Sequence, residues 1–184
     1  MLDVRPLGLD GVFEIRPSKI EDSRGFFSEV WSDERMAEAG FHISFVQDNH
    51  SYSAAKGVLR GLHFQVPPAA QYKLIRVSKG SVFDVAVDIR RDSASYGEWV
   101  GAVVSAELWN QLLISPGFAH GFVTLEDHCE VQYKVSAPYR PDLERAIRFD
   151  DPAIGIEWPI ASDRIHLSDK DRAASLLSLV ETGF

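Results

Sequence analysis

A short apolar segment of the chain, Gly57–Gln65, carries an arginine, a glycine, a histidine and a glutamine within six residues. Arginine and histidine are costly to bury unless they are paired or solvated. A strand that keeps Arg60 and His63 among aliphatic and aromatic neighbours is therefore expected to line a wet cavity. In such a cavity the imidazole can accept a proton and the guanidinium can bind an anion.

The spacing of these two residues raises a geometric problem. Side chains alternate between the two faces of a regular strand, so Arg60 and His63, three positions apart, would point to opposite faces. Gly61 lies between them, and a glycine inside a strand often marks a bulge. We expect a bulge at Gly61 that turns both side chains toward one pocket. The alternative is an arginine on the outer face and a hydrogen-bonded histidine in the core.

Residues elsewhere in the chain could complete an acid–base site that needs no cofactor. Such a site requires a base that works near neutral pH, a carboxylate to orient it, a cation for a developing oxyanion, and an acid on the opposite side. His63 can serve as the base, with Asp171 or Asp84 as its carboxylate. Lys73 can supply the cation and Tyr133 the acid. Tyr133 shares an apolar strand face, however, and could instead be a core tyrosine with one hydrogen bond.

A metal site is the competing interpretation of the histidines. The segment Pro116–His120 resembles the second sequence motif of the cupins. The first cupin motif, a His-x-His pair, is broken because Gln65 stands where the second histidine would be. Catalytic sites of first-row metals usually use three protein ligands. His63 and His120 have no clear third partner, so the sequence predicts no metal.

Composition narrows the class of protein. The 184 residues suffice for one domain with a real core, and 45% hydrophobic content is typical of a soluble globular chain. A net charge of -8 argues against binding to nucleic acid or to an anionic membrane surface. The lone Cys129 excludes an internal disulfide, and we find neither a membrane span nor a signal peptide. We therefore expect a cytoplasmic protein.

The pattern of elements is that of a mainly β protein. Many short strands separated by glycine and proline turns predict an antiparallel sandwich or jelly roll, in one domain over residues 1–184. Ser32–Gly40 is predicted to be a short outer helix, capped by its serine and ended by its glycine. From about residue 151 the chain is loop-rich. A C-terminal helix is predicted through Ala173–Val180, after a capping box at Ser168–Asp171.

Two predicted strands have faces that could either meet solvent or line a cavity. Residues 43–53 place Gln47, Asn49 and two serines on one face, for which the solvent-exposed interpretation is favoured. The strand Ser81–Ile89 alternates apolar residues with a small, acidic face that holds Asp84. The inside of a narrow barrel would have such a face, and the alternative is again exposure to solvent.

Five motifs taken together, in this order, resemble the dTDP-4-dehydrorhamnose 3,5-epimerase family. They are Asp22–Glu29, Phe45–Ser51, Gly57–Gln65, Gly80–Arg90 and Pro116–Phe122, and the match continues through Tyr133, Tyr139, Glu144 and Leu167–Asp171. The resemblance covers roughly residues 10 to 172. It implies a metal-free, cofactor-free cupin jelly roll with a few short peripheral helices, usually a homodimer.

The resemblance also implies roles for individual residues. His63 matches the catalytic base, Asp171 its orienting partner, and Tyr133 the general acid. Lys73 matches the residue next to the keto oxygen of the sugar. The positions that match those holding the nucleotide-sugar are Arg24, Glu29, Gln47, Asn49, Arg60, His120, Glu144 and Lys170.

The implied activity is epimerisation at C3 and C5 of dTDP-4-dehydro-6-deoxy-D-glucose to dTDP-4-dehydro-L-rhamnose through an enolate. A 4-keto group acidifies the hydrogens on both neighbouring carbons, and a base and an acid on opposite faces can invert a centre without a redox cofactor. Three alternatives stay open at this stage. They are an epimerase that acts at C3 or C5 alone on a related dTDP-4-keto sugar, a metal-dependent cupin, and a cupin that binds a nucleotide-sugar without catalysis.

Overall fold

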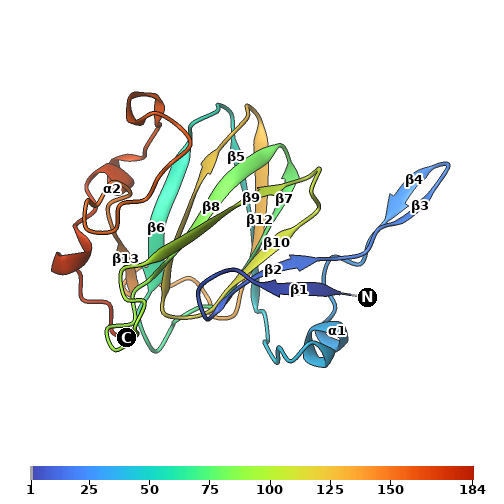
Figure 1. Ribbon diagram of the computed structural model, residues 1–184, viewed down its shortest axis with the longest axis horizontal. Coiled ribbons are helices and arrows are strands. Elements are labelled where there is room, and N and C mark those ends of the chain that lie inside the picture. Colours follow the sequence, from blue (N-terminus) through green and yellow to red (C-terminus); the bar gives the residue numbers. More distant parts are fainter. Residues whose placement is uncertain (1) are drawn as a thin grey trace.

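Two antiparallel sheets packed face to face form the body of the molecule in a computed structural model that describes residues 2–184 (Figure 1). The six-stranded sheet follows the order β1-β2-β10-β7-β12-β5 and comprises β1 (Asp3–Pro6), β2 (Val12–Arg16), β10 (Gln111–Ile114), β7 (Lys73–Lys79), β12 (Cys129–Val135) and β5 (Gln47–Ser53). The five-stranded sheet follows the order β13-β6-β11-β8-β9 and comprises β13 (Glu144–Ala146), β6 (Leu59–Gln65), β11 (Phe118–Thr124), β8 (Ser81–Asp88) and β9 (Trp99–Ser105). The predicted antiparallel, mainly β architecture is confirmed.

The strand β8 is buried on both faces, which explains its composition. Its small face, with Val82 and Ala86, packs in the core between the two sheets. Its other face, with Val85 and Val87, packs against the C-terminal segment of the chain. Asp84 lies on the small face and is fully buried. Of the two alternatives left open for this face, the interior one is therefore correct and exposure to solvent is not.

Two short helices lie at the periphery. The first, α1 (Asp33–Glu38), begins after Ser32, whose hydroxyl accepts a hydrogen bond from the backbone of Arg35, and Gly40 follows its end with a φ of 91°. The predicted outer helix at Ser32–Gly40 is therefore confirmed. Within residues 2–184, no helix has the length and apolar character needed to cross a membrane.

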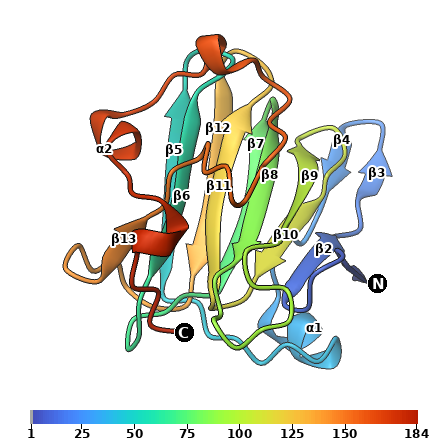
Figure 2. The same cartoon turned by 60° about the vertical axis from the view of Figure 1, so that its left-hand side comes forward.

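The C-terminal segment, residues 151–184, covers the outer face of the five-stranded sheet (Figure 2). Its apolar residues Ile154, Leu177 and Val180 pack against that face. Two isolated parallel β-bridges, Val58 with His166 and Ile147 with Ser175, connect the segment to the body. The segment therefore closes one wall of the molecule.

The C-terminal helix predicted through Ala173–Val180 is wrong. Between residues 169 and 180 the structure has the short helix α2 (Asp169–Arg172) and a 3-10 turn at Leu177–Leu179. The Ser175 carbonyl accepts a hydrogen bond from the backbone of Arg148, and the Leu177 amide donates to the Asp151 carboxylate at 2.7 Å. Backbone groups that a helix would pair internally are thus bonded to another segment, and the chain stays extended.

The predicted bulge at Gly61 is confirmed. Strand β6 pairs with β11 at Arg60 and again at His63, but the two partner positions on β11 are one residue closer together. The extra residue of β6 turns Arg60 and His63 toward the same side. Gly61 has a φ of 136°, and a Cβ built on it would lie 2.5 Å from the Cα of Gly121. Only glycine fits here.

The substitution Gly61→Ala is expected to destabilise the protein by about 2–4 kcal/mol, because the added methyl would collide with backbone in a conformation that alanine disfavours. Urea unfolding measures this change. The matched control is Gly40→Ala, which also has positive φ but meets no atom within 4 Å, and it should cost only about 1 kcal/mol. Equal losses in the two variants would contradict the steric argument.

Candidate active site

A cavity of about 670 Å³ opens between the two sheets. Every residue predicted for the site lines it except Arg24 and Glu29. The lining residues that were predicted are Gln47, Asn49, Arg60, His63, Lys73, His120, Tyr133, Glu144, Lys170 and Asp171. They come from β5, β6, β7, β11, β12, β13 and α2, so both sheets and the C-terminal segment contribute.

His63 and Asp171 form the central pair of the cavity. His63 Nε2 lies 2.5 Å from Asp171 Oδ1, so Asp171 rather than Asp84 orients this imidazole. Burial raises the pKa of the Asp171 carboxyl, but the hydrogen bond and charge of His63, the Ser168 hydroxyl and the charge of Lys170 together bring that pKa below its usual value. A carboxylate accepts from Nε2–H, which leaves Nδ1 with a free lone pair. His63 is thus arranged as a base.

Ser168 supports this pair, and its role was not anticipated from the sequence. Its hydroxyl donates to Asp171 Oδ2 at 2.9 Å and accepts from the Asp171 backbone amide at 3.1 Å. The predicted capping box is therefore half formed, since Ser168 caps α2 while the Asp171 side chain bonds to His63. The capping signal was visible in the sequence, but it gave no indication that the carboxylate would reach a residue on β6.

Tyr133 lies on the opposite wall from His63. It belongs to β12 of the six-stranded sheet, whereas His63 belongs to β6 of the five-stranded sheet, and both line the same cavity. Burial raises the pKa of the Tyr133 phenol, the nearby Arg60 opposes this shift, and Glu144 adds to it. The phenol therefore keeps its proton at neutral pH and can donate it.

Lys73 places an ammonium group beside the base. Its Nζ donates to the backbone carbonyl of His63 at 3.0 Å. Burial lowers the pKa of Lys73 to about 8, against the attraction of Asp84 and Glu144, so the side chain is largely cationic at neutral pH. A buried cation, which water screens little, stabilises a developing oxyanion strongly.

His120 is held by the buried carboxylate of Asp84. His120 Nε2 lies 2.9 Å from Asp84 Oδ2. Burial lowers the pKa of His120 more than Asp84 raises it, so the imidazole is neutral near pH 7. With Nε2–H donated to Asp84, the ring keeps Nδ1 as a hydrogen-bond acceptor.

A polar network surrounds the cavity mouth. The Tyr139 hydroxyl donates to Glu144 Oε2 at 2.7 Å, and Lys170 forms an ion pair with the same carboxylate. Burial raises the pKa of Glu144, but these two partners outweigh it and lower the pKa overall. The Tyr139 backbone amide also donates to Gln47 at 3.0 Å. Tyr139 is an aromatic residue of the mouth to which the sequence assigned no role.

The polar face of β5 was assigned to the wrong environment. The strand pattern alone favoured solvent for Gln47 and Asn49, whereas the family resemblance implied that they bind the ligand; they line the cavity, and Gln47 Nε2 donates to Asn49 Oδ1 at 2.8 Å. An alternation of polar residues does not distinguish a wet cavity from bulk water, because the side chains are hydrated in either place.

Arg60 reaches the cavity from β6 as an available cation. Its guanidinium donates to the backbone carbonyl of Tyr52 at 3.1 Å. Within residues 2–184 it has no ion pair with a carboxylate, unlike Arg24 and Arg148, which pair with Asp22 and Asp150. A guanidinium without a carboxylate partner at a cavity wall is suited to bind phosphate oxygens.

Arg24 and Glu29 lie outside this cavity. The hairpin of β3 (Ile20–Asp22) and β4 (Gly25–Phe27) projects from the body, and Arg24 lies in its turn (Figure 1). The Arg24 side chain is 88% exposed and pairs with Asp22. Glu29 follows the hairpin and pairs with Arg35 at 2.7 Å. The chain does not bring these two residues to its own site.

Gln65 occupies the position of the missing second cupin histidine. Its side-chain amide donates to the backbone carbonyls of Ala69 and Pro138, and its oxygen accepts from the Arg140 amide at 2.6 Å. The Gln65 side chain thus bonds to the backbones of two loops. Within the described part of the chain, no group of three or more His, Cys, Asp or Glu side chains is arranged to hold a metal ion.

An imidazole–carboxylate pair and a phenol on facing sheets, with an ammonium bonded to the backbone of the histidine, are groups that an isomerase of the cupin type can use to move protons on a bound ligand. The comparisons agree. Residues 6–178 match the family model described as dTDP-4-dehydrorhamnose 3,5-epimerase. The chain belongs to this family of isomerases.

Relatives are similar along almost the whole chain. The enzyme of that name from Salmonella typhimurium is 49% identical over 178 residues, covering 96% of each protein. The crystal structure of the 3,5-epimerase from Legionella pneumophila with dTDP-4-keto-L-rhamnose has a TM-score of 0.93 at 43% identity, covering 98% of this chain and 95% of the other. A 3'-monoepimerase from Streptomyces bikiniensis, solved with dTDP-quinovose, has a TM-score of 0.86 at 32% identity, covering 94% and 87%.

Lys73→Met is expected to raise the free energy of unfolding while removing activity. Because burial lowers the folded-state pKa to about 8 from 10.5, the protonated amine costs the folded state about 3 kcal/mol below pH 8. This cost falls as pH rises from about 8 toward 10.5, where the unfolded chain also loses the proton. Loss of the hydrogen bond to His63 offsets part of the gain, so we expect a net gain of about 1–3 kcal/mol at pH 7.

Urea unfolding of wild type and variant at pH 7 and pH 10 measures this difference, which should shrink at the higher pH. The matched control is Lys134→Met, which removes a surface ion pair with Asp48 and should change stability by less than about 1 kcal/mol. A Lys73→Met protein less stable than wild type at pH 7 would contradict the proposed cost.

Proposed function

We propose that this chain epimerises dTDP-4-dehydro-6-deoxy-D-glucose at C3 and C5 to dTDP-4-dehydro-L-rhamnose, without a metal or redox cofactor. The observation that carries the proposal is the position of His63 and Tyr133 on facing sheets of one cavity. A base and an acid on opposite sides of a ring are what inversion at carbon requires. Family membership supports the substrate class.

Each inversion can be written with balanced protons. His63, oriented by Asp171, takes the hydrogen from the carbon beside the keto group, and the electron pair moves onto the keto oxygen as an enolate. The Lys73 ammonium stabilises that oxygen. Tyr133 then gives its proton to the other face of the same carbon. His63 loses its proton to solvent, and the Tyr133 phenolate recovers one.

One base can serve both carbons. In the glucose-configured ring the hydrogens on C3 and C5 are axial on the same face, so His63 on that face meets both without turning the substrate. The acid on the opposite wall likewise faces both carbons. The same residues can thus perform two inversions in succession.

The remaining polar residues would hold the nucleotide-sugar. Arg60 has no carboxylate partner among the described residues and would bind the diphosphate. Gln47, Asn49, Glu144 and Lys170 line the mouth, where the ligand must enter. His120 would accept a hydrogen bond from a sugar hydroxyl through Nδ1. We also propose that residues 1–184 form one domain, because the C-terminal segment supplies Lys170 and Asp171 to the cavity.

A homodimer would complete the site. We propose that the β3–β4 hairpin of a partner brings Arg24 and Glu29 to the cavity. Three observations support this: the hairpin projects from the body, its Ile20 and Phe27 are 68% and 67% exposed, and β5 at the cavity mouth is a sheet edge with one free side. Free edges and exposed apolar strands are suited to pair with a second chain.

An epimerase acting at C3 alone is the second candidate. It is favoured by the similarity to the 3'-monoepimerase, which is close in fold. One structure of that protein carries a double substitution of a histidine and a tyrosine whose separation along the chain equals that of His63 and Tyr133. The same pair of residues can therefore belong to a single or a double epimerase.

Turnover in deuterium oxide distinguishes these candidates. The 3,5-epimerase should place deuterium at both C3 and C5 of the product, as read by proton NMR, whereas label at C3 alone would establish the single epimerase. His63→Asn should incorporate no label, because it lacks the base. Tyr133→Phe should exchange hydrogen with retention of configuration, since His63 can return a deuteron to the face from which it took the proton. Unimpaired epimerisation by His63→Asn would contradict the assignment of the base.

Arg60→Ala is expected to raise KM by about 10- to 100-fold with little change in kcat, because a diphosphate contact is equally strong in the ground state and the transition state. Steady-state kinetics with the dTDP-sugar measure both constants. The matched control is Arg148→Ala, which removes an exposed arginine paired with Asp150 and should leave KM unchanged. An unchanged KM in Arg60→Ala would exclude Arg60 from binding the diphosphate.

A further inference from the structure

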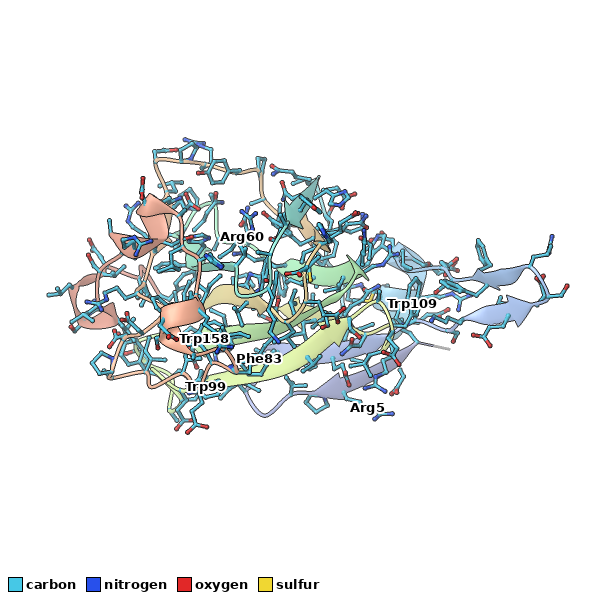
Figure 3. All side chains as sticks on the ribbon, turned by 90° about the horizontal axis from the view of Figure 1, so that it is seen from above. Arg5, Arg60, Phe83, Trp99, Trp109 and Trp158 are labelled. Atoms are coloured by element: carbon cyan, nitrogen blue, oxygen red, sulfur yellow. The ribbon has the colours of Figure 1, made fainter. Side chains whose placement is uncertain are left out.

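The backbone of Trp109 has an unusual conformation at the point where the β3–β4 hairpin leaves the body (Figure 3). Its φ is 57°, in the left-handed region that residues other than glycine seldom adopt. Such a residue persists only where its surroundings hold it in place. The contacts of its side chain therefore identify what the conformation serves.

The first group of contacts of the Trp109 side chain is with the hairpin and the residues beside it. The indole Nε1 donates to the Ser28 hydroxyl at 2.9 Å, just beyond β4. The ring meets Phe26 of β4 edge to face, with centroids 4.7 Å apart. The ammonium of Lys19, just before β3, lies 4.5 Å from the centroids of both rings. Trp109 thus contacts the base of both strands.

The other contacts fix Trp109 to the body. The guanidinium of Arg76, in the middle of β7, lies 5.0 Å from the ring centroid. The next residue, Asn110, accepts from the Ser105 amide and donates to the Val103 carbonyl and to Glu14. The turn between β9 and β10 is therefore fixed to both sheets, and the indole contacts one cation of the sheet, Arg76, and one just before the hairpin, Lys19.

A hairpin with two three-residue strands has no core of its own. Isolated two-stranded hairpins are at best marginally stable in water. Ile20 and Phe27 are mostly exposed, so they contribute little apolar burial against the body. The direction of the hairpin thus depends on the contacts at its base.

We propose that Trp109 is a positioning residue that sets the direction of the β3–β4 hairpin, and thereby delivers Arg24 and Glu29 to the cavity of a partner subunit. This inference rests on the proposed homodimer. Trp109 is not among the described residues that line the cavity of its own chain, so its effect on catalysis would be exerted in trans. Loss of the ring leaves Arg24 intact but lowers its effective concentration at the partner's site.

Kinetics give the first test. Trp109→Ala should raise KM by about tenfold and change kcat by less than about twofold, as expected when a binding contact is lost. Trp109→Phe keeps a ring between the two cations and should restore most of the affinity. Phe26→Ala removes the ring partner from the exposed hairpin and should reproduce the Trp109→Ala phenotype, which covers the case in which Trp109→Ala does not fold. Normal KM values in both alanine variants would overturn the proposal.

Mixed dimers give the decisive test. Two differently tagged chains, one Trp109→Ala and one His63→Asn, are co-expressed and the mixed dimer is isolated. One of its two sites then combines an intact His63 with a hairpin held by an intact Trp109, so the mixed dimer should show a wild-type KM, with about half of the wild-type kcat because only that site is active. Asp171→Asn with His63→Asn is the control that should stay inactive, because both defects lie in their own site.

The pairing of Arg24→Ala with His63→Asn separates the two hypotheses. Recovery of wild-type KM in this mixed dimer, together with the same recovery for Trp109→Ala, supports the inference. Recovery with Arg24→Ala but not with Trp109→Ala would overturn the role of Trp109 and leave the shared site standing. If neither mixed dimer recovers a wild-type KM while the wild-type enzyme epimerises normally, the hairpin does not act in trans. That result would overturn the inference and leave the proposed function standing.

Discussion

The hydrogen bond between His63 and Asp171 joins residues that are 108 positions apart in the chain, and the site depends on it. His63 lies on a strand of the five-stranded sheet, whereas Asp171 lies on a four-residue helix that could not be stable by itself. That helix is held by the packing of the C-terminal segment on the outer face of the sheet. The apolar contacts of Ile154, Leu177 and Val180 therefore hold the Asp171 carboxylate against the His63 imidazole indirectly.

The same cavity contains several buried ionisable groups whose burial lowers the stability of the folded protein. Lys73, Asp84 and His120 are all less than 10% exposed, and burial shifts the pKa of Lys73 and of His120 downward. Asp84 partly offsets these costs, because it bonds His120 and attracts Lys73. An oxyanion site needs a cation that water does not screen, and that requirement conflicts with stability.

The β3–β4 hairpin forms a separate two-stranded sheet, and none of its residues lines the cavity of the same chain. A body formed by two sheets buries its own apolar faces, yet Phe26 and Phe27 remain exposed on a projection that carries a charged turn. Arg24, Glu29 and the cavity thus lie in different parts of one chain. In the proposed homodimer a twofold axis would bring the two together, because such an interface uses the same surface of both copies and each hairpin then faces the other copy.

Much of the site could be predicted from the sequence because residue types and spacing determine chemistry locally. The crowding of Arg60, Gly61 and His63 predicted both the bulge and the shared direction of the two side chains, and the alternation in Ser81–Ile89 predicted an acidic interior face. A glycine in a strand and a period of two are local signals that need no knowledge of distant segments. The order of five motifs was sufficient for the family.

Only the tertiary structure decided the pairings and environments that depend on distant segments. The residue patterns, taken without the family resemblance, could not choose between Asp84 and Asp171 as the partner of His63 and favoured solvent for the strand face that holds Gln47 and Asn49. They also predicted a helix where Ser175 and Leu177 bond to another segment. In each case the deciding interaction joins residues far apart in the chain. A local pattern records which groups can form hydrogen bonds, but the packing of the sheets and of the C-terminal segment selects the partner.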